Sequence, residues 1–144
     1  MGTKNRMYVK FDAKSVNEGF ARMVVAAFVM DMNPTLDDLS DIKTAVSEAV
    51  TNAIIHGYQD EEKQVEMEGM KEGNKLTIVV RDYGIGIADV KTAMKPFFTT
   101  KQNEERSGMG FAFMEAFMDE LQVISEPGKG TEVTMTKHIE RSHE

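Results

Sequence analysis

The sequence predicts an α+β fold, a two-layer sandwich in which helices cover one face of a mixed, mostly antiparallel sheet. The first observation is the order of expected elements: a strand, two helices, a hairpin, an irregular segment, a third helix and a second hairpin. Such an order groups the helices on one side of the sheet. The second observation is size, because 144 residues, 41% of them hydrophobic, suffice for one core and are too few for two ordinary domains. We therefore expect a single domain over residues 1–144.

The first half of the chain carries clear boundary signals. Residues 7–12 alternate between polar and apolar side chains as in a strand, and Ser15 is expected to cap the helix that follows. The Asn-Pro pair at 33–34 ends that helix. Thr35 is expected to cap a second helix, which runs to Gly57.

The second half contains two hairpins and one helix around an irregular segment. The strands are expected at residues 64–70, 75–81, 121–125 and 131–139, and the helix at 110–119. Residues 84–108 show no steady periodicity. A segment of this length inside a compact domain is either disordered or a functional lid.

Composition and charge exclude several classes of protein. A net charge of −7 disfavours direct binding to nucleic acid, and the absence of cysteine excludes disulfides and thiolate zinc sites. The longest apolar run, residues 23–30, is too short to span a bilayer, and the N-terminus lacks the pattern of a signal peptide. We expect a soluble cytoplasmic protein with neither nucleic acid nor membrane as a direct partner.

The second expected helix has a polar side that carries Glu48 and Asn52. At about 100° per residue, these side chains lie one turn apart, opposite an apolar stripe that includes Ile42, Val46 and Val50. An Asn oxygen is a suitable ligand for Mg²⁺, and a Glu one turn earlier is placed to accept a proton. Polar residues at this spacing are also typical of a solvated helix face, so both interpretations stay open.

Asp82 directly follows an expected strand and begins the motif Asp-Tyr-Gly-Ile-Gly, which contains Gly84 and Gly86. Glycines at this spacing let the backbone approach a ligand closely. A carboxylate at the end of a strand can accept a hydrogen bond from an exocyclic amine. The alternative is an ordinary turn.

Two further glycine pairs follow. The run Ser107, Gly108, Met109 and Gly110 leads directly into the third helix, an arrangement that directs free backbone N–H groups toward phosphate. A Gly-Lys-Gly sequence precedes Thr131 between the last two strands, where a hairpin turn explains it equally well. Each pair alone is weak evidence for a ligand site.

Taken in order, the four motifs closely resemble those of the Bergerat-fold ATPases, the family shared by gyrase-type, Hsp90-type, MutL-type and histidine-kinase ATP domains. The chain has no Walker phosphate loop, so nucleotide binding would depend on these four motifs instead. Three segments resemble the anti-sigma F factors of the stage II sporulation protein AB family, which are serine-protein kinases. These are SEAVTNAIIHGY (47–58), PFFTTK (96–101) and ERSGMGF (105–111).

The resemblance implies a nucleotide site for ATP or ADP with Mg²⁺, closed by a flexible lid at about 87–108. Asn52 would coordinate Mg²⁺, Asp82 would bind the adenine amino group, and Glu48 would act as the general base. Arg106 would lie near the γ-phosphate as a second catalytic residue. The other ATP-binding positions that it implies are Gly84, Gly86, Thr99, Thr100, Ser107, Gly108, Met109, Gly110 and Thr131.

The resemblance also implies protein partners. The chain would bind a sigma factor of the sigma F type through Glu18 and Arg22, would phosphorylate a serine on an anti-anti-sigma factor, and would form a homodimer. For Glu18 and Arg22, a solvated helix face is the alternative. For Arg106, the alternative is an ion pair with Glu104 or Glu105.

Three related functions remain as alternatives. Anti-sigma B-type stress-response kinases share most of the motifs. A non-catalytic ATP-dependent switch would need Asn52 and Asp82 but would have no need of Glu48. The detached ATP domain of a histidine kinase would be preceded by a phospho-acceptor histidine, and none of the three histidines is so placed.

Overall fold

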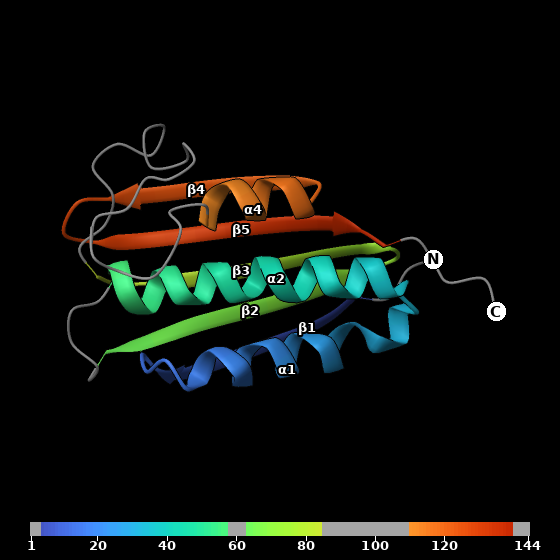
Figure 1. The fold of residues 1–144 in the computed structure, drawn as a ribbon, viewed down its shortest axis with the longest axis horizontal. Helices are drawn as coiled ribbons and strands as arrows, with labels where there is room; N and C mark the ends of the chain where they lie inside the picture. The colour runs from blue at the N-terminus through green and yellow to red at the C-terminus, as the bar shows by residue number, and fades with distance from the viewer. Residues whose placement is uncertain (1–3, 58–62, 85–109, 140–144) are drawn as a thin grey trace.

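The computed structural model describes residues 4–57, 63–84 and 110–139, which form two layers (Figure 1). One layer is a five-stranded sheet with the strand order β1-β2-β3-β5-β4. Its strands are β1 (Lys4–Asp12), β2 (Gln64–Glu72), β3 (Lys75–Asp82), β4 (Glu120–Glu126) and β5 (Gly130–His138). The other layer contains α1 (Asn17–Val29), α2 (Leu36–Asn52) and α4 (Gly110–Phe117). The predicted α+β sandwich is confirmed, and the expected lid at about 87–108 lies entirely outside the described residues.

All four pairings between the described strands are antiparallel, so the expectation of a mixed sheet is wrong. The two helices between β1 and β2 return the chain to the end where β1 finished, so β2 runs back along β1. The strands β3 and β4 do run in the same direction. They never form a parallel pair, because β5 lies between them.

Local sequence signals place most element boundaries correctly. Thr35 caps α2 as predicted, since its hydroxyl oxygen accepts a hydrogen bond of 3.0 Å from the backbone N–H of Asp38. Gly73 has a φ of 60° in the two-residue turn between β2 and β3. The prediction for Ser15 is wrong: α1 begins at Asn17, and its cap position, Val16, makes no side-chain hydrogen bond.

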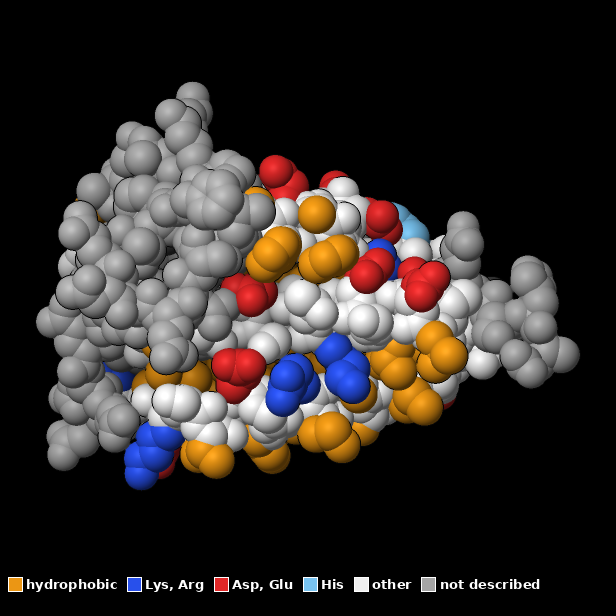
Figure 2. Space-filling view, in the orientation of Figure 1, with side chains coloured by type: hydrophobic (Ala, Val, Ile, Leu, Met, Phe, Trp, Pro, Cys, Tyr) orange, Lys and Arg blue, Asp and Glu red, His pale blue; other side chains and the backbone are white. Residues whose placement is uncertain are grey.

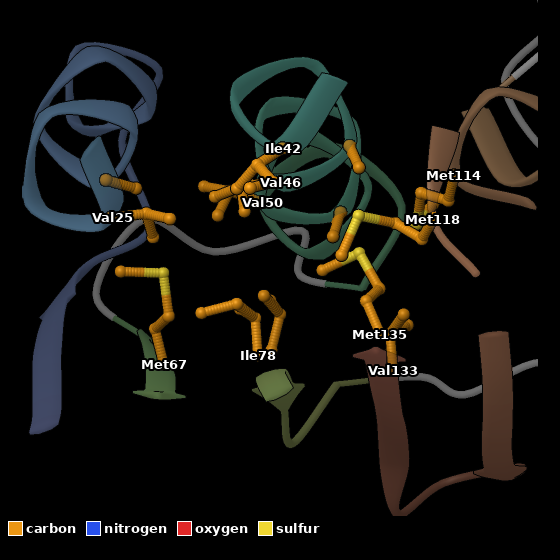
Figure 3. Close-up of a cluster of buried hydrophobic side chains, with 14 of the residues drawn as sticks. Val25, Ile42, Val46, Val50, Met67, Ile78, Met114, Met118, Val133 and Met135 are labelled. Atoms are coloured by element: carbon orange, nitrogen blue, oxygen red, sulfur yellow. The ribbon is translucent and has the colours of Figure 1, made fainter. Parts of the chain in front are cut away.

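The core lies between the helices and one face of the sheet, with α2 packed between α1 and α4. Figure 3 shows Val25 of α1 and the α2 residues Ile42, Val46 and Val50 facing Met67, Ile78, Val133 and Met135 of the sheet, with Met114 and Met118 nearby. In the described part of the chain, no helix is both long and apolar enough to cross a membrane.

Two buried lysines tie the sheet to the C-terminal ends of helices. The Lys71 ammonium donates to the carbonyl of Phe28 at the end of α1 and pairs with Asp31, both at 2.6 Å. The Lys137 ammonium donates to the carbonyl of Phe117 at the end of α4, at 2.8 Å. Because a helix C-terminus carries partial negative charge, a cation there both completes hydrogen bonding and stabilises the helix.

Candidate functional site

The elements that carry the predicted site residues meet at one end of the sandwich. Figure 1 shows the C-terminal end of α2, the end of β3, the turn between β4 and β5 and the beginning of α4 on the same side. A π-helical turn, η2 (Ala53–Gly57), continues α2 and packs against β3 and β5. Such π turns occur often at functional sites. The predicted positions on α2, β3, β5 and α4 therefore share one end of the molecule.

Asp82 is the buried acid of this end. It is the last residue of β3, is 5% exposed and lies opposite Thr131 of β5. Burial raises the pKa of its carboxyl from 3.8 to about 6, although backbone N–H groups of Gly84 and Thr131 oppose that change. The Gly84 N–H donates to the carboxylate at 2.9 Å. A buried carboxyl with a shifted pKa at the edge of a fold is typical of a ligand site.

Beside Asp82, a small hydroxyl pair lies across the last hairpin. The hydroxyl oxygens of Ser125 and Thr131 are 2.8 Å apart, and the Ser125 hydroxyl also donates to the carbonyl of Gly130 at 2.9 Å. These contacts orient the Thr131 side chain next to the buried acid. Ser125 carries no signal of this role in the sequence, because only the register between β4 and β5 places it opposite Thr131.

Gly130 is the second residue that sequence reasoning missed. Its φ is +113°, and a Cβ there would lie 2.1 Å from the Asp82 carbonyl oxygen and 2.7 Å from the Cα of Tyr83. The two backbones therefore approach each other more closely than any other residue type permits. Its signal was present as the second glycine of the Gly-Lys-Gly sequence, which was equally compatible with an ordinary turn.

The predicted polar side of α2 is confirmed as a half-buried face. Glu48 and Asn52 are both partly exposed, whereas Val46, Ala49 and Val50 on the apolar stripe are buried. Glu48 lies at a hollow of about 380 Å³ on the outer surface of α1 and α2. The hollow is lined by Arg22, Leu36, Leu39, Ser40, Lys43, Thr44, Ser47 and Glu48. Figure 2 shows basic side chains over α1 and α2 in this region, with an acidic side chain beside them.

The two residues predicted to bind a partner have different surroundings. Arg22 is exposed on α1 and lines the hollow. Glu18 is half-buried, and its carboxylate accepts hydrogen bonds from the hydroxyls of Ser47 and Thr51 on α2, at 2.6 and 2.5 Å. Glu18 therefore joins the two helices beside Glu48.

Of the remaining predicted ATP-binding and catalytic residues, some lie in the described part of the chain and others do not. Gly110 begins α4 at the site end, as expected. The other predicted contacts of the lid lie outside the described residues: Gly86, Thr99, Thr100, Arg106, Ser107, Gly108 and Met109. Among the described side chains, no group of three or more His, Asp or Glu could hold a metal ion alone.

The fold and the arrangement at this end are those of a histidine kinase-like ATPase domain, and the family of that description matches residues 10–137. Among curated relatives, the anti-sigma F factor of Thermoanaerobacter sp. (strain X514) is 56% identical, over 94% of each chain. The Bacillus subtilis anti-sigma F factor is 49% identical, over 96% of each chain. The chain therefore belongs to the histidine kinase-like ATPase family and, within it, to the anti-sigma F factors. This membership implies an ATP-binding domain of the kinase type.

Solved structures agree on the fold. The RsbU and RsbW domains of a Mycobacterium tuberculosis protein align with a TM-score of 0.71 at 20% identity, covering 96% of this chain and 33% of that one. The catalytic domain of the histidine kinase ThkA aligns with a TM-score of 0.56 at 15% identity, covering 91% of this chain and 97% of that one. At these identities the likeness concerns the fold alone.

The close backbone approach at Gly130 makes a testable prediction about stability. Gly130→Ala should lower the free energy of unfolding by about 2–4 kcal/mol, because the new Cβ meets backbone atoms and the positive φ is strained. Gly128→Ala is the matched control, since its φ is +80° but its Cβ would meet nothing within 4 Å. It should cost about 1–2 kcal/mol. Urea unfolding measures both, and equal losses would contradict the role given to Gly130.

Proposed function

We propose that this chain is an anti-sigma factor that binds a sigma factor of the sigma F type and uses Mg-ATP to phosphorylate a serine on an anti-anti-sigma protein. The names of the anti-sigma F relatives support the sigma partner. The observation that carries the kinase activity is the placement of Glu48 one turn before Asn52, on a partly exposed helix face near the end that holds Asp82. A sigma factor acts in the cytoplasm, and we place the chain there.

At the base-binding end, Asp82 would accept a hydrogen bond from the amino group of adenine. Its burial favours this role, because a hydrogen bond to a carboxylate is strong in a site from which water is excluded. Thr131, oriented by Ser125, would support the same edge of the base through its hydroxyl. The backbone at Gly84 has no side chain to block the approach of the base.

At the phosphate end, Asn52 would hold Mg²⁺ through its side-chain oxygen. One amide ligand fits this ion, because Mg²⁺ is usually bound by one or two protein oxygens together with waters and substrate phosphates. When bound, the ion supplies charge neutralisation between the phosphates. Gly110 at the start of α4 would offer a backbone N–H to the same phosphates. The lid contacts from Gly86 to Met109 remain predictions from the sequence.

Glu48 would act as the general base. Its carboxylate would take the proton from the serine hydroxyl as that oxygen bonds to the γ-phosphorus, the bond from that phosphorus to the β–γ bridging oxygen breaks, and ADP leaves. Phosphoryl transfer asks the protein mainly for positioning and charge stabilisation, which suits a site with few reactive groups. Arg106, predicted from the sequence, would stabilise the charge that develops on the transferred group.

The surface of α1 would bind the sigma factor. Phe20 and Met23 are 48% and 65% exposed, and Figure 2 shows apolar side chains along the edge of the molecule formed by α1. Arg22 lies beside them and adds a positive charge to this surface. Exposed apolar side chains with a charged neighbour are typical of protein interfaces. We propose a homodimer on the strength of the family resemblance alone.

Removing the charge of Asp82 should weaken nucleotide binding. Asp82→Asn is expected to cost about 1–3 kcal/mol of ATP affinity, since the charge-assisted hydrogen bond to the adenine amine is lost. Isothermal titration calorimetry measures this affinity. An unchanged dissociation constant would contradict the adenine contact.

The pH dependence tests the same contact. Because the pKa of Asp82 in the free protein is about 6, lowering the pH from 7 to 5 protonates the acceptor and should weaken binding about tenfold more in the parent than in Asp82→Asn. The comparison between the two proteins removes the titration of the nucleotide itself.

The same group affects the stability of the fold. Since the pKa of Asp82 is raised on folding, the stability that this carboxyl contributes is present below about pH 4 and is lost as the pH rises through 6.

Glu48 decides between a kinase and an ATP-dependent switch. Incubation of the parent with labelled ATP, Mg²⁺ and an anti-anti-sigma protein should yield phosphoserine on that protein. Glu48→Gln should lower the rate by about 10²–10⁴-fold while ATP affinity survives, because the base acts only in the transfer step.

The matched control is Glu115→Gln, which removes an exposed carboxylate from α4. This variant should keep the parental rate. Transfer by Glu48→Gln at the parental rate would contradict the base assignment, and absence of phosphoserine with the parent would favour the non-catalytic switch.

Charge reversal tests the sigma-binding surface. Arg22→Glu should abolish capture of the sigma factor in a pull-down and leave ATP affinity unchanged, because Arg22 is exposed on α1. Lys10→Glu reverses an exposed charge on β1 and should retain the complex. If Arg22→Glu still captured the sigma factor at the parental level, the proposal that this surface binds the sigma factor would be wrong.

A further inference from the structure

We propose that Glu18 is a positioning residue for the phosphoryl-transfer reaction, and that it holds the last turn of α2 in place through the hydroxyls of Ser47 and Thr51. The inference rests on the proposed function, in which Glu48 and Asn52 act on that same turn. Glu18 lies on α1, and the two hydroxyls lie on α2, so the contact joins separate helices.

The geometry of the contact is that of a clamp with two points. The Ser47 hydroxyl donates to one carboxylate oxygen at 2.6 Å, and the Thr51 hydroxyl donates to the other at 2.5 Å. Hydrogen bonds from hydroxyl groups to a carboxylate are short and about twice as strong as those between neutral groups. Thr51 is 4% exposed, so water competes little for its hydroxyl.

The clamp acts on the residues that the proposed reaction needs. Ser47 and Thr51 are four positions apart and therefore lie on one face of α2, with Glu48 and Asn52 each one residue further along. One hydrogen bond would restrain the last turns of α2 at a single point. Two, separated by one turn, resist both rotation of α2 about its axis and sliding along it. The same restraint therefore adds to the packing of the apolar stripe in holding Glu48 and Asn52 in their directions.

The end of α2 needs such a restraint because its own hydrogen bonding changes there. The α-helix ends at Asn52, and the π turn begins at Ala53, whose N–H is shared between the carbonyls of Ala49 and Val50. A π turn is rare and is usually confined to a single turn. The start of α2 differs, because Thr35 caps it within its own chain segment. The turn that carries Asn52 is held instead by the hydrogen bonds to Glu18 of α1.

A purely structural role would make Glu18 equivalent to any other anchor of α1. The chain offers a matched control at the opposite end of that helix, where Asp31 pairs with Lys71 at 2.6 Å. Asp31→Asn weakens an anchor near the end of α1 without touching the last turn of α2. Comparison of substitutions at Glu18 and Asp31 therefore distinguishes a general loosening of α1 from displacement of the last turn of α2.

The kinetic experiment uses the full chain with Glu18→Gln, Thr51→Val and Thr51→Ser. Glu18→Gln and Thr51→Val should lower kcat for serine phosphorylation by about 10–100-fold, because reacting groups are misplaced. Affinity for metal-free ADP, held at the Asp82 end, should change by less than about twofold. Thr51→Ser, which keeps the hydroxyl, should restore kcat. Asp31→Asn should keep the parental kcat. A parental kcat in both Glu18→Gln and Thr51→Val, or an equal loss in Asp31→Asn, would overturn the proposal.

A second measurement does not depend on catalysis. Amide hydrogen exchange of the nucleotide-free protein should be faster in Glu18→Gln over residues 47–57 and unchanged over 36–44, with no change in Asp31→Asn. If the parent transfers no phosphate, the proposed kinase function fails. Faster exchange confined to 47–57 would then still support the clamp, and parental exchange in Glu18→Gln would overturn it.

Discussion

The orientation of α2 is the constraint on which the other features of the molecule depend. This helix lies between α1 and α4 and against the sheet, so its apolar stripe has a single direction in which it can be buried. Burying one Val-sized or Ile-sized side chain contributes roughly 1.5–3 kcal/mol, well above the roughly 0–1 kcal/mol of a surface ion pair. The core therefore sets the rotation of α2. Glu48 and Asn52 follow on its polar side, and Ser47 and Thr51 meet Glu18.

A second constraint acts at the same end through the sheet. The register of β3 and β5 sets Asp82 opposite Thr131, and Gly130 lets the two backbones approach within a distance that a Cβ would prevent. The result is a carboxyl buried deeply enough to raise its pKa to about 6. A buried carboxyl lowers stability unless it is paired. Its position beside the two hydroxyl groups of Ser125 and Thr131 is typical of a site where a ligand supplies the partner.

The sequence predicted elements whose boundaries depend on local chemistry. Thr35 and Gly73 behave as expected, because a cap and a two-residue turn need only their immediate neighbours. Ser15 failed as a cap. The chain leaving β1 makes a turn in which the Asn17 side chain bonds the carbonyl of Asp12, and α1 starts two residues later than Ser15. The expectation of a mixed sheet failed because strand order depends on which distant strands become neighbours.

The sequence by itself determined the family, and it supplied the chemical groups of the proposed site, because both reside in residue types at set spacings along the chain. The pair Glu48 and Asn52 and the acid Asp82 are examples, and the helix period and the strand end already imply where they lie. Only the tertiary structure decided what holds these groups. Glu18 meets Ser47 and Thr51 across 29 and 33 residues of sequence, and such a contact exists only once α1 has packed against α2.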